Sequence, residues 1–486
     1  MSKKKERGDF QTPDLLAIKV LSKLRDIGYS PDLIIEPTCG LGSFLFASAE
    51  TYPDAEILGF EINETYVNKT QDRSLPKKIT VETVDFFSKD WQGLFIDRSF
   101  EELLIVGNPP WVTSSGMSKL SADNLPNKNN LKGLKGIEAI TGGSNFDISE
   151  WIVLELIKCV PANKRVCFAF ILKTSVIRNI IESAQSLTKR RIEPKGIWFV
   201  DAKKSFNASV DAGLFVFDII PGEVNEKTNQ NDCRVYNDLT TNKSFLIGLR
   251  EGCLIADIEK WESTCHLSAL KKSKYIWRSG VKHDCSKVME LTEKNGVLVN
   301  KLGETVDIEE DLLFPLYKSS DLSKGKWKGR YVIVTQESIG QCTDYIENKY
   351  PKLWSYLEQN EEYFEKRKSS IYRDKPRFSI FGVGDYSFEK WKVAISGMYK
   401  HLRFRLIAPM NDKPVMLDDT CYFIGFQSEE EAVHVYEYMT SAEVSKFLES
   451  RIFWDSQRPI TKKLLSMLKI DDYEEEPIPY QTQLFG

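Results

Sequence analysis

Short apolar runs alternate with amphipathic stretches between residues 31 and 220, a pattern typical of a parallel β-sheet covered by helices. The apolar runs predict strands at 33–36, 56–61, 79–84, 103–107, 166–172, 196–200 and 214–220. The amphipathic stretches predict helices at 13–27, 43–51, 64–73 and 148–159. Asp147 is placed to cap the last helix, with Glu150 three residues further on, as in a capping box. We therefore expect an α/β fold in this part of the chain.

The pattern changes after Pro221, where we predict a domain boundary. Residues 222–232 are polar and predict a linker, and the sequence beyond them mixes strand-like runs with aromatic and basic clusters. We expect one domain over 1–221, a second domain of mixed α+β structure over 233–470, and an extended tail over 471–486. Residues 113–145 are rich in Gly, Asn, Ser and Lys and follow a candidate active-site strand, so we predict a substrate lid there.

Composition narrows the class of protein. The 486 residues are 42% hydrophobic and 28% charged, which are ordinary values for globular proteins and disfavour a collagenous or disordered chain. The 66 Lys and Arg against 70 Asp and Glu give a net charge of −4, which by itself indicates no nucleic-acid partner. A local basic groove would still suffice to bind one.

Cysteine and histidine are poorly placed for a metal site or a disulfide framework. The nine cysteines form no CxxC pair, and the chain has only four histidines. Cys265, His266, His283 and Cys285 lack a second cysteine pair at ligand spacing, so we expect no metal. The first seven residues lack the apolar core of a signal peptide, and the apolar runs are too short to span a bilayer. We expect a cytoplasmic protein.

A glycine turn containing Gly40 and Gly42 joins the first predicted strand to a helix. Glycines allow backbone amides to approach a ligand closely at a helix N-terminus. The dinucleotide fingerprint requires a third glycine where this chain has Leu45, so a ligand without a pyrophosphate is favoured. Glu61 follows Gly40 by 21 residues at the end of the next strand, where a carboxylate can accept both ribose hydroxyls. Asp85 follows the third strand and could accept an exocyclic adenine amine. A packing turn without a ligand is the alternative.

The strand predicted at 103–107 leads directly into Asn108-Pro109-Pro110-Trp111. The two prolines lock the backbone and remove two amide donors, so the Asn108 side-chain oxygen and the Pro109 carbonyl can both face outward as acceptors. Two converging acceptors suit a planar NH2 group, and Trp111 offers a face on which a flat base can stack. Accepting these hydrogen bonds keeps the amine lone pair out of conjugation and makes the nitrogen a better nucleophile. A proline-terminated strand with a buried Trp is the alternative.

These motifs resemble those of the S-adenosylmethionine-dependent adenine-N6 DNA methyltransferases, in particular the gamma class of bacterial type II restriction-modification systems. The resemblance covers residues 8–220 and includes the motif order, with Gly8-Asp-Phe-Gln-Thr12-Pro13 ahead of the glycine turn. It implies a Rossmann-like methyltransferase domain that binds S-adenosylmethionine and methylates N6 of a flipped-out adenine. The cofactor contacts that it implies are Thr12, Glu36, Thr38, Gly40, Gly42, Glu61, Ile62, Asp85, Phe86 and Asn108.

The same resemblance implies the catalytic residues, which are Asn108, Pro109, Pro110, Trp111 and Phe206. In the family, aromatic side chains at the last two positions stack on opposite faces of the target adenine. Trp111 stands where Tyr or Phe is commoner, which keeps the stacking surface. Glu36 stands where some members have Asp, which keeps a carboxylate near the methionine ammonium. In the family the Thr12 region contacts the methionine carboxylate.

A second domain would have to hold the duplex while a nucleotide is flipped out. Basic residues interleaved with aromatic and small residues suit contacts with the DNA backbone and bases. The residues that we expect to contact DNA are Arg278, Lys282, Arg373, Lys375, Arg377, Lys392, Lys400 and Arg403. Solvated surface is the alternative for each of them.

The expected partner is double-stranded DNA, with a monomeric enzyme, no membrane, and a cognate restriction endonuclease that acts on the same site as a separate chain. The Asn-Pro-Pro-aromatic motif alone does not separate adenine-N6 from cytosine-N4 methylation. Methylation of RNA or of a protein glutamine is a further alternative, which the long basic and aromatic second half disfavours. A DNA-binding module with a vestigial cofactor fold is the alternative from outside the enzymes.

Overall fold

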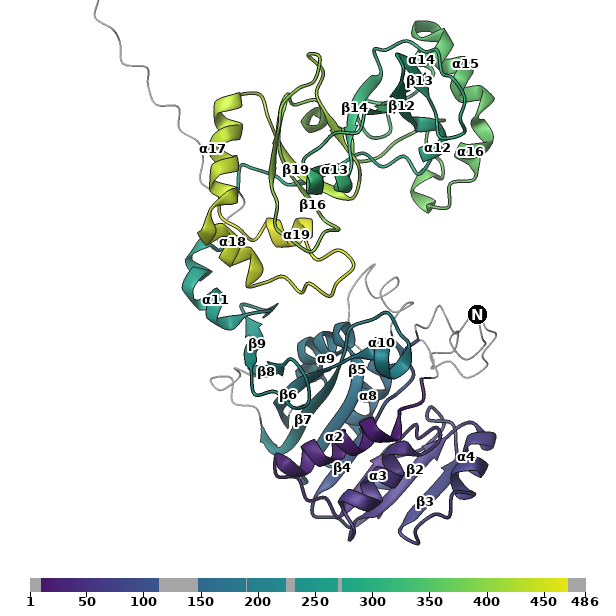
Figure 1. Ribbon diagram of the computed structural model, residues 1–486, viewed down its shortest axis with the longest axis vertical. Helices are drawn as coiled ribbons and strands as arrows, with labels where there is room; N and C mark the ends of the chain where they lie inside the picture. The colour runs from purple at the N-terminus through teal and green to yellow at the C-terminus, as the bar shows by residue number, and fades with distance from the viewer. Residues whose placement is uncertain (1–9, 113–146, 189, 224–231, 270–272, 471–486) are drawn as a thin grey trace, which may run out of the picture. The chain divides into compact units, whose positions relative to one another are not determined.

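The computed structural model describes residues 10–112, 147–188, 190–223, 232–269 and 273–470. The chain divides into two compact units, Met1–Ile258 and Glu259–Gly486 (Figure 1). The predicted lid at 113–145 and the predicted tail at 471–486 lie outside the described residues. Among the described residues, no helix is both long and apolar enough to cross a membrane.

Unit 1 is built on a ten-stranded sheet with the order β10-β9-β8-β6-β7-β5-β4-β1-β2-β3. Strands β3, β2, β1, β4 and β5 are parallel neighbours, and β7 runs antiparallel to both β5 and β6. In chain order the strands are β1 (Leu33–Glu36), β2 (Glu56–Glu61), β3 (Ile79–Thr83), β4 (Leu103–Gly107), β5 (Val166–Lys173), β6 (Arg190–Val200), β7 (Ala212–Glu223), β8 (Cys233–Tyr236), β9 (Ser244–Arg250) and β10 (Cys253–Ile255). The expected α/β fold is confirmed.

The helices of unit 1 that the structure describes are α2 (Asp14–Asp26), α3 (Ser43–Thr51), α4 (Glu64–Gln71), α5 (Trp91–Asp97), α8 (Ile148–Cys159), α9 (Thr174–Leu187) and α10 (Ala202–Phe206). Among these helices, α2 precedes β1 and the others lie between consecutive strands. The sequence pattern predicted α2, α3, α4 and α8 and missed α5, α9 and α10. Asp147 caps α8 as predicted, but its carboxylate accepts from the Ser149 amide at 3.1 Å, while Glu150 accepts from Asn179 at 2.8 Å.

Both faces of the sheet are buried at its centre. Every residue of β1 and β4 is buried, as expected for parallel strands covered on both sides. Val20 of α2, Phe44 of α3, Ile34 and Leu104 belong to one buried apolar cluster. The alternate strand residues are buried on the opposite face. This packing holds the ends of the strands in place, and polar residues at these ends form the candidate active site described below.

The predicted domain boundary at Pro221 is wrong. Strand β8 pairs in parallel with β6, and β9 and β10 continue the same sheet, so unit 1 extends to Ile258. The rings of Trp198 and Tyr236 stack with centroids 5.0 Å apart, and Cys233 is fully buried. The polar residues that follow β7 interrupt the alternation of apolar and amphipathic stretches, but the same sheet continues with β8.

Unit 2 has mixed α and β structure, with two sheets in the orders β11-β19-β16-β17 and β13-β12-β15-β14-β18. Its strands are β11 (Arg278–Ser279), β12 (Glu290–Lys294), β13 (Val297–Val299), β14 (Leu313–Tyr317), β15 (Arg330–Ile333), β16 (Trp391–Ser396), β17 (Arg405–Ile407), β18 (Met416–Leu417) and β19 (Cys421–Phe426). Its helices are α12 (Ser286–Met289), α13 (Ser319–Lys324), α14 (Tyr345–Lys349), α15 (Pro351–Gln359), α16 (Glu361–Glu365), α17 (Glu429–Thr440), α18 (Ala442–Glu449) and α19 (Lys462–Leu465), and α11 (Ile258–Thr264) leads into it.

Candidate active site

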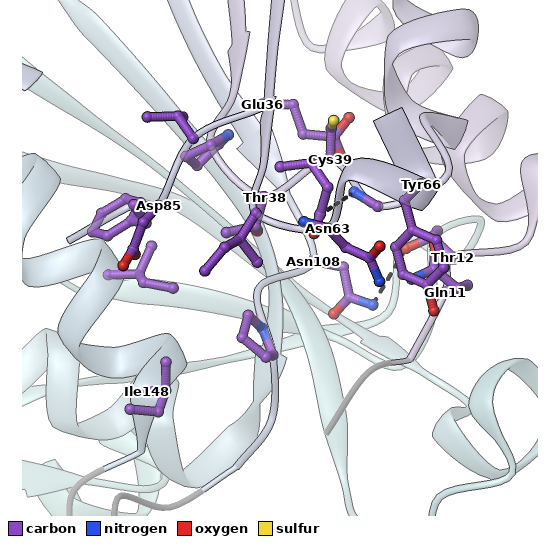
Figure 2. Close-up of a pocket in the computed structure, with 18 of the residues that line it drawn as sticks. Gln11, Thr12, Glu36, Thr38, Cys39, Asn63, Tyr66, Asp85, Asn108 and Ile148 are labelled. Carbon is purple, nitrogen blue, oxygen red and sulfur yellow. Dashed lines mark hydrogen bonds between the residues drawn. The ribbon is translucent and has the colours of Figure 1, made fainter. Parts of the chain in front are cut away.

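The carboxyl ends of β1, β2 and β4 and the turn after β3 surround a cavity of about 630 Å³ (Figure 2). The strand order reverses direction between β1 and β4, which is where open α/β sheets bind their ligands. The volume of the cavity lies within the range of roughly 300–1,000 Å³ typical of small-molecule sites. Of the ten predicted cofactor contacts, nine line this cavity, namely Thr12, Glu36, Thr38, Gly40, Glu61, Ile62, Asp85, Phe86 and Asn108.

The glycine turn after β1 adopts a conformation that requires glycine. Gly40 and Gly42 have φ values of +52° and +79°. A Cβ atom on Gly40 would lie 2.5 Å from Oε1 of Gln11, and one on Gly42 would lie 2.7 Å from a methyl carbon of Thr70. Gly42 does not line the cavity but forms the N-cap of α3. It therefore shapes the turn rather than the cavity surface.

Two acidic side chains at neighbouring strand ends are fixed by backbone amides. The Glu61 carboxylate accepts from the Gly40 amide at 2.9 Å and from the Asn63 amide at 2.8 Å. Oδ1 of Asp85 accepts from the Phe87 amide at 3.0 Å. Carboxylate oxygens have two lone pairs each, so both groups can still accept hydrogen bonds from a ligand.

Three buried polar atoms of the cavity have no hydrogen-bond partner among the described residues. They are Oε2 of Glu36, Oγ1 of Thr38 and Oδ1 of Asn108. Leaving such an atom unsatisfied costs about 1–3 kcal/mol, so three of them around one cavity indicate a polar ligand. Burial raises the pKa of Glu36 well above its ordinary value, and the negative charge of Glu61 raises it further. A cationic ligand group such as an ammonium would offset both effects. The residues present therefore fit S-adenosylmethionine.

Asn108 projects from the end of β4 between the two ends of the cavity (Figure 2). Figure 2 shows Asp85 and Ile148 on one side of it and Gln11, Thr12 and Tyr66 on the other. Its amide nitrogen donates to the Phe10 carbonyl at 3.0 Å and to Oγ1 of Thr12 at 3.3 Å. The other amide atom, Oδ1, accepts no hydrogen bond from the residues that the structure describes. Pro110 lines the cavity with Asn108, whereas Pro109 and Trp111 do not.

Trp111 and Phe206 lie together, but they do not form an open sandwich. Their ring centroids are 5.0 Å apart with an interplanar angle of 73°, and both side chains are buried. The ring of Phe10 lies 5.5 Å from Trp111 and 6.3 Å from Phe206. A base stacked between the two rings needs parallel planes with space between them, so these rings would have to move apart. The stacking role of Trp111 and Phe206 stays a prediction.

Several cavity residues were not predicted from the sequence. Asn63 caps α4 two residues after Glu61, and Tyr66 follows three residues later on the same helix, so an N-cap close to the acidic strand end was an available signal. Ile148 and Ile152 reach the cavity from α8, which no local pattern connects to the glycine turn. The other unpredicted lining residues are Phe10, Gln11, Pro37, Cys39, Ser43, Glu64, Val84 and Phe87.

The predicted DNA-contacting residues of unit 2 differ in exposure. Arg373, Lys375, Arg377, Lys400 and Arg403 are exposed. Lys282 pairs with Asp284 at 3.2 Å and with Asp419 at 3.7 Å. Arg278 lies in β11, with its guanidinium 4.6 Å from the Tyr386 ring centroid.

Three predicted basic residues have structural partners. Arg377 pairs with Glu358 at 3.2 Å and Glu361 at 3.0 Å, and Arg403 donates to the Ser323 carbonyl at 2.8 Å. Lys392 is 1% exposed and donates to the Glu389 carbonyl at 2.6 Å. Burial lowers the pKa of Lys392 to about 7. The prediction that Lys392 contacts DNA is therefore wrong, because its ammonium lies inside the fold.

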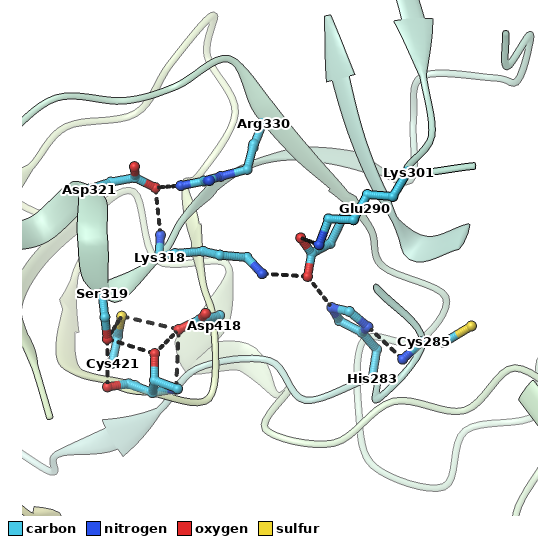
Figure 3. A network of polar contacts seen from close by, with 11 residues as sticks. His283, Cys285, Glu290, Lys301, Lys318, Ser319, Asp321, Arg330, Asp418 and Cys421 are labelled. Atoms are coloured by element: carbon cyan, nitrogen blue, oxygen red, sulfur yellow. Dashed lines mark hydrogen bonds and ion pairs between the residues drawn. The ribbon is translucent and has the colours of Figure 1, made fainter. Parts of the chain in front are cut away.

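A polar network in unit 2 is centred on Glu290, which is 3% exposed (Figure 3). Its carboxylate lies 2.6 Å from Nζ of Lys318, 2.8 Å from Nζ of Lys301 and 3.5 Å from Nε2 of His283. Burial alone would raise the pKa of Glu290, but these partners outweigh it and hold the pKa well below its ordinary value. Glu290, Lys318, His283 and Lys282 line a cleft of about 740 Å³ within unit 2.

His283 is engaged in this network through both ring nitrogens. Nδ1 accepts from the Cys285 amide at 3.1 Å, while Nε2 faces Glu290. Within the part of the chain that the structure describes, no group of three His, Cys, Asp or Glu side chains is arranged to hold a metal ion.

The fold and the site together define a class of protein. The solved structure of the type IIL restriction-modification enzyme MmeI in complex with DNA matches this chain with a TM-score of 0.51 at 13% identity. The match covers 94% of this chain and 63% of that chain, and at this identity it shows the fold alone. This fold, together with a cavity whose residues fit S-adenosylmethionine, is the one expected of the S-adenosylmethionine-dependent methyltransferases.

Sequence comparison narrows the class to a family. The type II methyltransferase M.NspV of Nostoc sp. is 42% identical over 476 residues, 96% of this chain and 97% of that protein. M.CvrRI, a type II methyltransferase of Paramecium bursaria Chlorella virus XZ-6E, is 35% identical over 113 residues, 23% of this chain and 27% of that protein. No protein-family model matches the sequence. The chain belongs to the type II methyltransferases, and S-adenosylmethionine is its cofactor.

Proposed function

We propose that this chain is a gamma-class DNA methyltransferase that methylates N6 of adenine in a short double-stranded recognition sequence. The observation that carries the proposal is Oδ1 of Asn108, a buried acceptor in the cofactor cavity that has no hydrogen-bond partner among the described residues. An acceptor in this position suits the exocyclic amine of a base. The substrate class is supported by the type II methyltransferase relative and by the fold shared with a DNA-bound restriction-modification enzyme.

The residues of unit 1 divide into cofactor-holding and amine-holding groups. Glu36 would pair with the methionine ammonium, Glu61 would accept the ribose hydroxyls, and Asp85 would accept the adenine amine. When bound, S-adenosylmethionine supplies an electrophilic methyl group on a sulfonium. Oδ1 of Asn108 and the Pro109 carbonyl would accept the two hydrogens of the target amine and keep its nitrogen lone pair available. The surplus proton would pass to water.

The target base must leave the duplex to reach this amide. Trp111 and Phe206 would stack on it after separating from their present edge-to-face contact. Unit 2 would hold the duplex, with Arg373, Lys375 and Lys400 as exposed phosphate contacts. Arg278 and Lys282 lie on the same unit and are candidates for contacts with base edges. Methylation of the site would protect it from a cognate restriction endonuclease.

The test is expression of the full chain in a host without DNA methylation, followed by sequencing for modified bases. We expect N6-methyladenine at one short motif, and resistance of that motif to an endonuclease that recognises it. The variant N108A, produced at the same level, should leave the DNA unmodified. Detection of N4-methylcytosine at the motif would show that the target base is cytosine and not adenine. Absence of any modified base would overturn the proposal and direct the search to RNA or protein-glutamine substrates.

A further inference from the structure

The amide of Asn108 has a defined orientation, which decides the atom that it offers to a substrate. Its nitrogen donates to the Phe10 carbonyl and to Oγ1 of Thr12 at 3.0 and 3.3 Å. Rotating the amide by half a turn would bring Oδ1 against the Phe10 carbonyl oxygen, so that two acceptors would face each other. Phe10 and Thr12 therefore keep Oδ1 directed into the cavity.

The segment that carries these two acceptors is anchored to the glycine turn. The Leu41 amide donates to Oε1 of Gln11 at 2.9 Å, and the Ser43 hydroxyl donates to the Thr12 carbonyl at 2.7 Å. Gly40 makes room for the Gln11 side chain, because a Cβ atom there would lie 2.5 Å from Oε1. The position of the Asn108 amide thus depends on the turn that surrounds the cofactor.

We propose that Thr12 and the Phe10 carbonyl are positioning groups that hold Asn108 for the target amine, and that Thr12 couples this orientation to cofactor binding. The inference rests on the proposed function. A hydroxyl has one donor hydrogen and two acceptor lone pairs. Thr12 can therefore accept from Asn108 while its own hydrogen is donated to a ligand in the cavity, which it also lines. A role in cofactor binding alone would leave the amide orientation unaffected by Thr12.

The experiment compares Thr12→Val, which keeps the shape and removes the hydroxyl, with Thr12→Ser, which keeps the hydroxyl. Single-turnover methylation of a duplex containing the recognised motif is measured with the full chain at saturating S-adenosylmethionine. We expect T12V to lower the rate constant by about three- to tenfold, the effect of one lost neutral hydrogen bond. T12S should recover most of the loss. An unchanged rate constant for T12V, with only a raised cofactor KM, would overturn the proposal.

A second measurement distinguishes positioning from a loss of structure. The affinity of each protein is measured, with saturating S-adenosylhomocysteine, for duplexes that carry either adenine or purine at the target position. Purine lacks the exocyclic amine, so the ratio of the two affinities reports the contact made by Oδ1 of Asn108. We expect T12V to reduce this ratio relative to the unaltered protein. An equal loss of affinity for both duplexes would contradict the proposal.

The outcomes separate the inference from the proposed function. If the unaltered chain methylates no DNA, the proposed function fails whatever the Thr12 variants do. If it methylates DNA and T12V matches it in both measurements, the positioning role alone fails. Should T12V lower the melting temperature, Thr12→Ala provides the same comparison without placing a methyl group against the Asn108 amide.

Discussion

At the scale of a single residue, Glu36 is a buried carboxyl group with a strongly raised pKa. Burial and the charge of Glu61 raise its folded-state pKa, so the folded protein keeps this proton to a higher pH than the unfolded chain does. The contribution of Glu36 to the free energy of unfolding therefore falls as pH rises from the ordinary carboxyl pKa towards the raised one.

The first prediction concerns the variant Glu36→Gln, which has nearly the same shape and no charge. At neutral pH it should melt higher than the unaltered protein by roughly 2–4 °C, the shift that about 1 kcal/mol produces in a unit of this size. Its affinity for S-adenosylhomocysteine should fall about 10- to 100-fold because the ammonium loses a charged partner. Thermal unfolding and calorimetric titration measure the two effects.

The pH dependence provides the control for this prediction. Affinity of the unaltered protein should increase with pH through the Glu36 pKa, because only the carboxylate pairs with the ammonium, whereas E36Q should show a flat profile. Glu50→Gln removes an exposed carboxylate from α3 and should change neither property. Equal pH profiles for E36Q and the unaltered protein would refute the role assigned to Glu36.

The second prediction concerns Lys392, for which the free energy of unfolding should change with pH in the direction opposite to that for Glu36. Its folded-state pKa is lowered to about 7 by burial, so between that value and its ordinary pKa near 10.5 the unfolded chain binds more protons. The free energy of unfolding of unit 2 should therefore rise with pH over this window, by at most about 1.4 kcal/mol per pH unit. Urea unfolding at pH 7 and pH 9 measures the slope. Lys392→Met should flatten it, and a slope that persists in K392M would assign the effect to another group.

At the scale of elements, the sequence predicted the parts of the fold that have local causes. Strands β1, β2 and β4 and helices α3 and α8 have the predicted bounds because each is a continuous apolar run or amphipathic stretch between turn residues. The boundary at Pro221 failed because the membership of β8–β10 depends on pairing with β6, which has no local signal. The prediction that Lys392 contacts DNA failed for the same reason, because β16 is covered by its pairing with β17 and β19, which has no local signal.

In the candidate site, too, the features with a local cause were predictable from the sequence and the others were not. Glu36, Glu61, Asp85 and Asn108 were predictable because each lies at the end of a strand or just beyond it, and parallel strands bring their carboxyl ends to one edge. The contact of the Asn108 amide with Phe10 joins residues 98 positions apart and has no sequence signal. The closed arrangement of Trp111 and Phe206 likewise depends on side-chain packing, which composition and spacing do not specify.

The extension of the sheet leads to a prediction about the element β8–β10. A chain that ends at residue 258 should fold and bind S-adenosylhomocysteine as the full chain does, because it keeps the whole sheet. A chain that ends at residue 221 would uncover the β6 edge and Trp198, so we expect it to aggregate or to unfold at a lower temperature. Size-exclusion chromatography and thermal unfolding compare the two. A stable, cofactor-binding chain ending at 221 would show that β8–β10 are dispensable.

At the scale of the whole molecule, a net charge of −4 conflicts with a DNA partner only if charge is averaged over the surface. Arg373, Lys375 and Lys400 are exposed on unit 2, and replacing them together by alanine should weaken binding of duplex DNA. Each phosphate contact contributes about 0.9 to the slope of log affinity against log salt, so the slope should decrease by up to about 2.7. Fluorescence anisotropy over a salt series measures this change.

The matched control replaces three exposed lysines of unit 1, Lys19, Lys69 and Lys77, by alanine. Both triple variants have a net charge of −7, because three positive charges are removed from −4. If DNA binding depends on where the charges lie, only the unit 2 variant should lose affinity and salt dependence, while both variants keep their affinity for S-adenosylhomocysteine. Equal losses in the two variants would indicate a response to total charge and would remove these three residues from the DNA interface.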